Sequence, residues 1–441
     1  MQTVIVPLLP VLPGLTDSSQ LAVSWMVTIT LLVGAVITPI FGRLADMYGK
    51  KRILLTAFVV MTVGSLLCAV SSDIAVLIAA RALQGAGAAV IPIGVSMLRD
   101  ELPPHKLNGA IAMMSSTLGF GTALGLPFSA AIAQYANWHM LFIVTTLIGV
   151  VLIVATVVYV RESPAGSSGR FDGVGSVGLA AALVCLLVPV TQGGTWGWSS
   201  PAILSLFATA VVLFALWGFH QWRNDNPLVD LRVSMRRAVL IPNVVALLVG
   251  FAFFGNTLIT TQLLQTPSAD GGAGYDLTIL QAALCQIPPS IAMIVFAQVG
   301  VRITERFGSK VTMMCGATVL TVGYIVHAIS GKSLWAVIAT LGVTAIGTAL
   351  VYSTLSILIV RAVPAGMMAA ANGVNVLLRT VGSTVCSAVV ATILASHLVA
   401  GSHFSTSSGF TLAYLVCAVL AVIVFVACLA LPGKAPREVH P

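Results

Sequence analysis

The sequence predicts an all-α polytopic membrane protein. Hydrophobic residues make up 58% of its 441 residues and charged residues only 8%, and the mean hydropathy is +1.04. Apolar runs of about eighteen residues or more recur along the whole chain. Helices carry such runs across lipid because they satisfy their own backbone groups. Together these observations exclude a soluble multidomain protein.

Short polar stretches divide the chain into fourteen predicted spans. They are Met1–Thr16, Leu21–Phe41, Ile53–Val70, Ile74–Leu98, Leu107–Ala133, Met140–Val160, Gly173–Thr191, Pro201–Trp222, Val239–Leu263, Leu277–Gly300, Val311–Ile329, Leu334–Ile359, Ala369–His397 and Phe410–Leu431. The first run would rise only about 24 Å as a helix, against about 30 Å of hydrocarbon. We therefore expect that the chain begins partway through a truncated first helix, with a re-entrant segment as the alternative.

The net charge of +8 follows the predicted topology. All the Lys and Arg residues except Arg81, Arg379 and Lys332 fall in loops on one side, which the positive-inside rule makes the cytoplasm. Both termini are then cytoplasmic, and the protein is expected in the cell (inner) membrane. This distribution indicates no nucleic-acid partner. The seven cysteines lie in predicted spans without a Cys-x-x-Cys pair, so neither a metal site nor a disulfide framework is indicated, and no cofactor is expected.

One charged stretch, Gly42–Arg52, joins the second and third predicted spans as a tight hairpin. A degraded copy follows at Arg302–Lys310. Five positions recur at the same spacing: Arg43 with Arg302, Asp46 with Glu305, Tyr48 with Phe307, Gly49 with Gly308, and Lys51 with Lys310. One motif present twice in one chain indicates an internally duplicated transporter. We expect Asp46 to meet nearby cations or the N-terminus of a helix in the other half of the chain.

Two arginines lie inside predicted spans, where a charge is costly and is therefore expected to face a partner or a cavity. Arg81 is either a proton-linked or substrate-facing residue or a structural charge that fixes its helix to a neighbour. Arg379 shares one helix face with Asn372 and Asn375, which favours either substrate contact and gating or a structural role. The acidic residues all fall in loops or at helix ends. Among them Asp17 is the nearest candidate for proton coupling, with a surface carboxylate as the alternative.

Aromatic, amide and methionine side chains in the spans are candidates for lining a substrate cavity, with ordinary packing as the alternative for each. The set is Trp25, Met113, Met114, Phe254, Asn256, Gln262, Gln286 and Asn375. Methionine suits varied apolar ligands because its thioether side chain adapts its shape.

The chain resembles a major facilitator superfamily transporter, and in particular the fourteen-span drug:proton antiporter family. The motifs that carry the resemblance are Gly42–Arg52, Arg81–Ala89, Phe171–Gly175, Pro227–Leu231 and Asn372–Arg379. The resemblance implies two six-helix bundles, residues 1–160 and 238–441, with a two-helix insertion and its linkers at 161–237. It also implies a substrate site between the bundles, alternating access, and a hairpin that stabilises the outward-facing state.

Two departures from that family bear on proton coupling. The antiporter motif of span five is altered: Gly121 and Gly125 match it, but Pro127 is displaced by one place and Ser-Ala replaces the closing pair of glycines. The acidic position of span one falls on Met1. The expected function is export of small amphiphilic drug-like or antibiotic molecules by proton antiport, with a facilitative or proton-independent exporter of a metabolite or lipid as the alternative. An enzyme is not expected, because the loops are too short to hold a catalytic cluster, and we expect a monomer in the lipid bilayer.

Overall fold

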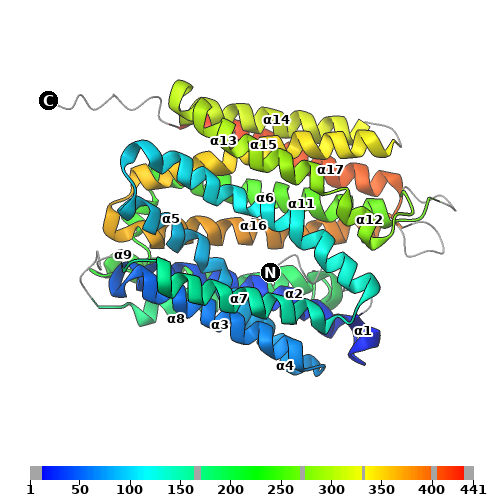
Figure 1. Cartoon of the computed structure of the whole chain (residues 1–441), viewed down its shortest axis with the longest axis horizontal. Helices are drawn as coiled ribbons and strands as arrows, with labels where there is room; N and C mark the ends of the chain where they lie inside the picture. The colour runs from blue at the N-terminus through cyan, green and yellow to red at the C-terminus, as the bar shows by residue number, and fades with distance from the viewer. Residues whose placement is uncertain (1–11, 163–169, 269–273, 330–332, 399–404, 432–441) are drawn as a thin grey trace.

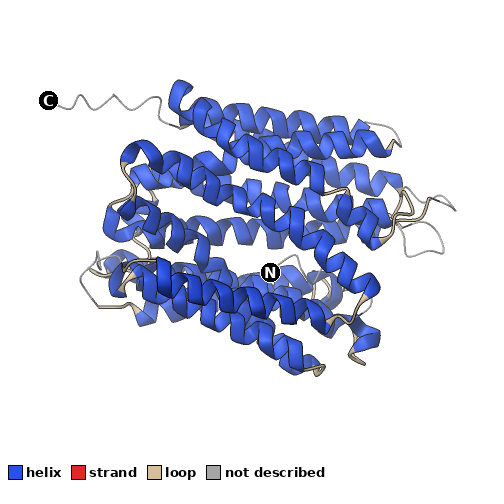
Figure 2. Ribbon diagram, in the orientation of Figure 1, coloured by secondary structure: helices blue, strands red, loops and turns tan. Residues whose placement is uncertain are grey.

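The computed structural model describes residues 12–162, 170–268, 274–329, 333–398 and 405–431. Nearly all of these residues are helical, and the strand-like pairing among them is a single bridge between Leu398 and Ser405 (Figure 2). Thirteen segments of this part of the chain are long and apolar enough to cross a membrane. Most of the first predicted span lies outside the described residues. Only its end is described, as the short helix α1 (Leu12–Leu15) and the residue that follows.

The helices follow the predicted order along the chain. The N-terminal helices are α2 (Gln20–Tyr48), α3 (Lys50–Val70), α4 (Ile74–Gln84), α5 (Val90–Glu101), α6 (Pro104–Tyr135) and α7 (His139–Tyr159). The inserted helices are α8 (Gly173–Trp196) and α9 (Pro201–Arg223), followed by the short α10 (Leu231–Ser234). The C-terminal helices are α11 (Arg237–Gln265), α12 (Ile279–Leu284), α13 (Ile287–Phe307), α14 (Ser309–Ile329), α15 (Leu334–Ala362), α16 (Met368–Ser396) and α17 (Ser407–Leu429).

The charged hairpin is tight, as predicted, but most of its residues are helical, so the second span runs past Phe41 and the third begins before Ile53. Helix α2 continues to Tyr48 and α3 begins at Lys50, so Gly49 alone makes the turn, with φ 106°. The copy has the same form, because Gly308, with φ 94°, separates α13 from α14. Residues with a side chain rarely adopt such φ values, and this explains glycine at both turns.

Two predicted spans are interrupted inside the bundle. Between α4 and α5 the chain forms a tight 3₁₀ segment, Gly85–Ala89. A Cβ on Gly85 would lie 3.0 Å from the backbone of α2 at Thr30, so this glycine permits close helix approach. Helices α12 and α13 are separated at Cys285 and Gln286, because Pro288 and Pro289 at the start of α13 have no backbone N–H to donate to the carbonyls four residues earlier.

The N-terminal helices and the C-terminal helices form two groups (Figure 1). In the N-terminal group α2, α3, α4 and α7 run together, and in the C-terminal group α13, α14, α15 and α17 run together. Between these sets run α6 of the N-terminal group and α11 and α16 of the C-terminal group. The groups meet where α16 packs against α2 and where α6 packs against α13 and α15. The inserted helices α8 and α9 pack on each other, and α8 also contacts α2 and α16. The largest buried core lies among the C-terminal helices.

Candidate functional site

The Gly42–Arg52 hairpin and its copy lie at the same end of the bundle, which we call the hairpin end (left in Figure 1). Here Asp46 is 1% exposed. Its carboxylate accepts hydrogen bonds from the backbone amides of Ala369, at 3.3 Å, and Ala370, at 3.1 Å, in the first turn of α16. The first amides of a helix lack intrahelical partners and form the positive end of its dipole. Asp46 on α2 therefore caps a helix of the C-terminal group, one of the two kinds of partner expected for it.

Two glycines bring the backbones of α2 and α16 into contact around this cap. A Cβ on Gly42 would lie 2.5 Å from the carbonyl oxygen of Ala369, and a Cβ on Gly373 would lie 2.9 Å from that of Thr38. No side chain fits at either position without moving a helix. The Asp46 contact is therefore short because both helices present glycine beside it.

Further polar contacts cross between the two helix groups at the hairpin end. Arg99 on α5 donates a hydrogen bond of 2.9 Å to the carbonyl oxygen of Val363, and Asn108 on α6 donates one of 3.2 Å to Glu305. Lys50 forms an ion pair with Asp100, which fixes α3 to α5 within the N-terminal group. At this end, therefore, α2 contacts α16 and α6 contacts α13, so both meeting lines of the two groups are closed.

The remaining charged residues of the two hairpins are placed unequally. Arg43 is buried, 5% exposed, whereas Arg302 is exposed. Arg52 is exposed and lies 3.7 Å from Glu162. Arg43 lines a pocket of about 430 Å³, which includes its open mouth, together with the 227–230 stretch, Asn243 on α11 and the first turns of α16. The composition of the spans did not single out Asn243. The resemblance at Pro227–Leu231 was the available signal for this region.

Arg81 is fully buried between α2 and α4. Its Nε donates to the carbonyl oxygen of Met26 at 3.2 Å, and Nη1 donates to Gln84, which in turn donates to Ser65 on α3 at 3.1 Å. Thr30 donates to the carbonyl oxygen of Arg81 at 3.0 Å. This network links three helices of one group, and it fits the structural alternative for Arg81.

Arg379 has different surroundings. Its side chain is half-buried, and its guanidinium carbon lies 5.1 Å from the centroid of the Tyr352 ring on α15. Asn375, one turn earlier, donates to Asn243 at 3.1 Å and to the carbonyl oxygen of Pro242 at 3.3 Å, and so joins α16 to α11. The polar face predicted on this helix therefore combines an interhelical bond with a charge that contacts an aromatic ring.

The other candidates for the substrate cavity are dispersed. Gln286 is buried at the start of α13, Gln262 is exposed near the end of α11, and Met113 is 66% exposed. Met114 packs close to Gly94 of α5. The rest of the set is partly buried: Trp25, Phe254 and Asn256. Their role as a cavity lining stays a prediction.

The structure also places Asp17, the candidate for proton coupling, and the altered antiporter motif of α6. Asp17 is exposed before the start of α2, with φ 48°, in agreement with a surface carboxylate. In α6, Pro127 lies inside the helix, and a Cβ on Gly121 would meet nothing within 4 Å. The close approach is instead at Gly119, where a Cβ would lie 3.0 Å from the carbonyl oxygen of Ser290. The altered antiporter motif did not indicate that glycine.

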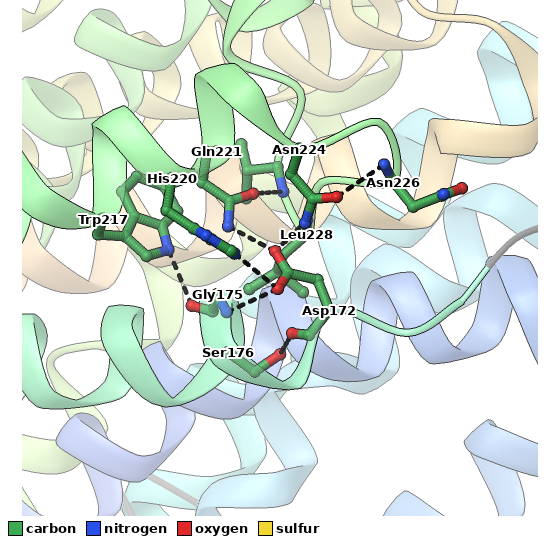
Figure 3. Close-up of polar contacts among 10 residues, drawn as sticks. Asp172, Gly175, Ser176, Trp217, His220, Gln221, Asn224, Asn226 and Leu228 are labelled. Atoms are coloured by element: carbon green, nitrogen blue, oxygen red, sulfur yellow. Dashed lines mark hydrogen bonds and ion pairs between the residues drawn. The ribbon is translucent and has the colours of Figure 1, made fainter.

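Asp172 is the centre of a second polar cluster, at the hairpin end of the inserted helices (Figure 3). Its carboxylate accepts hydrogen bonds from the Gly175 amide at 2.7 Å and the Gln221 side chain at 2.7 Å, and it lies 3.0 Å from Nε2 of His220. Burial acts to raise the pKa of Asp172, but the hydrogen bonds from His220, Gly175 and Gln221 outweigh it and hold the pKa below its ordinary value.

This cluster joins two stretches that sequence resemblance marked separately. Asp172 also accepts from the Leu228 amide at 3.4 Å, and Gln221 accepts from the Val229 amide at 3.1 Å. Leu228 and Val229 then pack into a core with residues of α2, α8 and α16. The insertion is therefore tied to the linker that leads into α11, and that linker lines the pocket beside Arg43.

Comparison with known proteins supports the same reading of the fold. The sequence profile of the Major Facilitator Superfamily matches residues 1–385 and 245–441. The chain belongs to the Major Facilitator Superfamily. As a member of this superfamily with many membrane-spanning helices, it is an integral multi-pass membrane protein.

Several relatives align with most of the length of this chain. It is 29% identical over 382 residues to the multidrug resistance protein Stp of Mycobacterium tuberculosis, which covers 85% of this chain and 69% of the relative. It is 28% identical over 385 residues to the tetracenomycin C resistance and export protein of Streptomyces glaucescens, with coverage of 85% and 69%. A probable actinorhodin transporter of Streptomyces coelicolor is 28% identical over 404 residues, 88% of this chain and 68% of that protein.

A solved structure shows the same fold at low sequence identity. The crystal structure of the human organic anion transporter MFSD10 (TETRAN) superposes with a TM-score of 0.69 at 14% identity, and covers 97% of this chain and 95% of that one.

Proposed function

We propose that the protein exports amphiphilic drug-like or antibiotic molecules by proton antiport with alternating access. The observation that carries the proposal is the cap that Asp46 of α2 places on the first turn of α16. A contact of this kind between two helix groups closes one end of a transporter, and its release would open that end. Relatives that are named for multidrug resistance and for antibiotic export or transport support the choice of substrate.

The proposed architecture has two bundles, residues 1–160 and 238–441, with the inserted helices between them in the chain at 161–237. The protein lies in the cell membrane with its hairpin end on the cytoplasmic side, because the loops at that end carry the excess of Lys and Arg. Substrate would bind near the bilayer midplane between the bundles. The protein would act as a monomer, since each chain supplies both halves of such a site.

The contacts described above would hold the hairpin end closed and would break when it opens. With the hairpin end closed, Asp46, Gly42 and Arg99 hold α2 and α5 against the C-terminal helices. Opening towards the cytoplasm would break the Asp46 cap and leave the first amides of α16 exposed to water. The network around Arg81 lies within one helix group and would move as a unit.

A second candidate function is export without proton coupling. Among the described membrane spans, the carboxylates all lie within two residues of the hairpin end, namely Asp46, Asp100, Glu101 and Glu305. Proton-coupled carriers commonly use an ionisable group inside the membrane. This placement favours facilitated export as the alternative to antiport.

Proteoliposomes containing the full chain would test both candidates. Efflux of ethidium and of an aromatic polyketide antibiotic would be followed with and without an imposed pH gradient, with protein-free vesicles as the control. We expect export of at least one compound to be several-fold faster with the gradient. Equal rates with and without it would overturn antiport and leave facilitated export, and the absence of protein-dependent movement of any compound would overturn both.

A further inference from the structure

The half-buried arginine of α16 lies beside an aromatic residue of a neighbouring helix, in surroundings without a carboxylate. We propose that Arg379 and Tyr352 form an anion-binding subsite, which selects amphiphiles that join an aromatic ring system to a carboxylate, a sulfonate or an ionised phenol. The inference rests on the proposed export function, because it names the chemical class of substrate for that same transporter.

The depth of Arg379 is the first step. It lies eleven residues after Met368, the first residue of α16, which places it about 17 Å along the helix axis. A charge so far into a membrane span marks a functional site by default.

The second step is the absence of a counter-ion. Among the residues that the structure describes, the Arg379 guanidinium donates no hydrogen bond and forms no ion pair, and its recorded contact is with the face of the Tyr352 ring. The carboxylates of the described spans lie at the hairpin end instead. Its N–H donors, which match the planar geometry of a carboxylate or sulfonate, thus have no protein acceptor in this part of the chain.

Arg81, the other arginine inside the predicted spans, has different surroundings. Arg81 is 1% exposed, and a backbone carbonyl and the Gln84 side chain accept its hydrogen bonds. Arg379 is half-buried, so its donors remain reachable. Of these two arginines, one is built into a protein network, and the other keeps its donors for a ligand.

Tyr352 and Phe253 supply the aromatic side of the subsite. The Tyr352 ring lies under the guanidinium, and the Phe253 ring of α11 lies 5.9 Å from it at 57°. The Tyr352 hydroxyl is buried, and it has no hydrogen-bond partner among the described residues. A buried hydroxyl without a partner is uncommon, and a bound anion would accept from it. An aromatic substrate would meanwhile pack against these rings.

The positive charge also predicts which molecules are rejected. A cation would be repelled by Arg379 and would find no carboxylate beside it, so affinity should follow the order anion, neutral compound, cation. Three probes with one fluorophore test this order: dansylglycine carries a carboxylate, dansylamide is neutral, and dansylcholine carries a quaternary ammonium. Binding of each to the purified full chain is read from dansyl fluorescence.

Substitutions then assign the selectivity to the two residues. We expect Arg379→Gln to weaken dansylglycine binding by tenfold or more while dansylamide changes by less than twofold. Arg379→Lys should restore part of the affinity, and Tyr352→Phe should weaken dansylglycine by a few-fold. Arg223→Gln is the matched control, because the Arg223 guanidinium also lies over an aromatic ring, that of Phe219, but at the exposed end of α9.

Each outcome decides the proposal. An equal loss for the charged and neutral probes, or stronger binding of dansylcholine than of dansylglycine by the unmodified protein, would overturn it. The probe ranking needs no variant, so it decides the matter even if Arg379→Gln fails to fold. Export of cationic but not anionic compounds would overturn this subsite and leave the export function standing. Selective dansylglycine binding without transport of any compound would do the reverse.

Discussion

The two hairpin segments, Gly42–Arg52 and Arg302–Lys310, share a turn but differ in what their acidic residues do. Gly49 and Gly308 both have positive φ, and Lys51 and Lys310 both donate to carbonyls in the last turn of a helix, α7 and α17 respectively. Asp46, however, is buried and caps α16, whereas Glu305 is exposed and accepts one side-chain hydrogen bond. The two copies thus have equivalent turns and lysine contacts, whereas the contact across the helix groups is made mainly by one of them.

The largest expected difference between the copies is in the acidic pair. Asp46→Asn keeps the size of the side chain but removes the charge that faces two helix amides, and hydrogen bonds to charged groups contribute about 1.5–3 kcal/mol. We expect the export rate in proteoliposomes to fall by about tenfold or more, since about 1.4 kcal/mol corresponds to a tenfold change in rate. Glu305→Gln should change the rate by less than about twofold, because its partner Asn108 bonds to a neutral oxygen as well.

The same two variants test whether the Asp46 cap controls opening of the hairpin end or only stabilises the fold. A cysteine placed at Ala371, next to the Asp46 cap, should react faster with a water-soluble maleimide in Asp46→Asn than in the parent or in Glu305→Gln. Both variants should remain inserted and monodisperse in detergent. If export is unchanged in Asp46→Asn, the unequal roles assigned to the two copies are wrong.

The glycine pair should instead behave alike. Gly49→Ala and Gly308→Ala each place a Cβ on a residue with φ near 100°, a region that costs about 1–3 kcal/mol for residues other than glycine. We expect both to lower the thermal stability of the protein in detergent by similar amounts. Gly218→Ala on α9, where a Cβ meets nothing within 4 Å, serves as a control and should be neutral or stabilising. A loss at only one of the two turns would show that the copies are not equivalent scaffolds.

The sequence predicted the spans and the hairpins because apolar runs and charge clusters are local signals. It could name only the kind of partner for Asp46, because Ala369 and Ala370 contribute backbone amides that leave no mark in residue type. The surroundings of Arg81 were open for the same reason, since Met26 contributes a carbonyl oxygen. Gly119 was missed in favour of Gly121 because spacing along α6 does not reveal which face meets α13.

Asp172 is a third carboxylate to compare with Asp46 and Glu305. It joins the inserted helices α8 and α9 to the linker that follows them. Asp172→Asn should lower thermal stability with less effect on export than Asp46→Asn, because its partners Gly175, Gln221 and Leu228 belong to one region of the chain. Its pKa is lower in the folded protein than the ordinary value of about 4, so the carboxylate stabilises the fold above that pH.

The pH dependence of that effect has a definite sign. The stability gap between the parent and Asp172→Asn should shrink as the pH falls below about 4, through the folded pKa of Asp172. Thermal unfolding of both proteins above and below this pH measures the gap. A gap that grows as the pH falls below about 4 would contradict the assigned hydrogen bonds.

The smallest expected effect concerns the two lysines. Lys51 donates to the carbonyl oxygen of Val157 at 3.0 Å, and Lys310 donates to those of Leu429, at 2.6 Å, and Leu431, at 3.3 Å. A cation near the last carbonyls of a helix contributes about 0.3–1 kcal/mol, and less in high salt. Lys51→Met and Lys310→Met should each lower thermal stability slightly, with the greater loss at Lys310, which has two acceptors. The losses should diminish between about 0.05 and 0.5 M salt, because these contacts lie near the surface where ions screen them. Losses that are independent of salt would mean that the stems of the lysines, rather than their charges, fix the ends of α7 and α17.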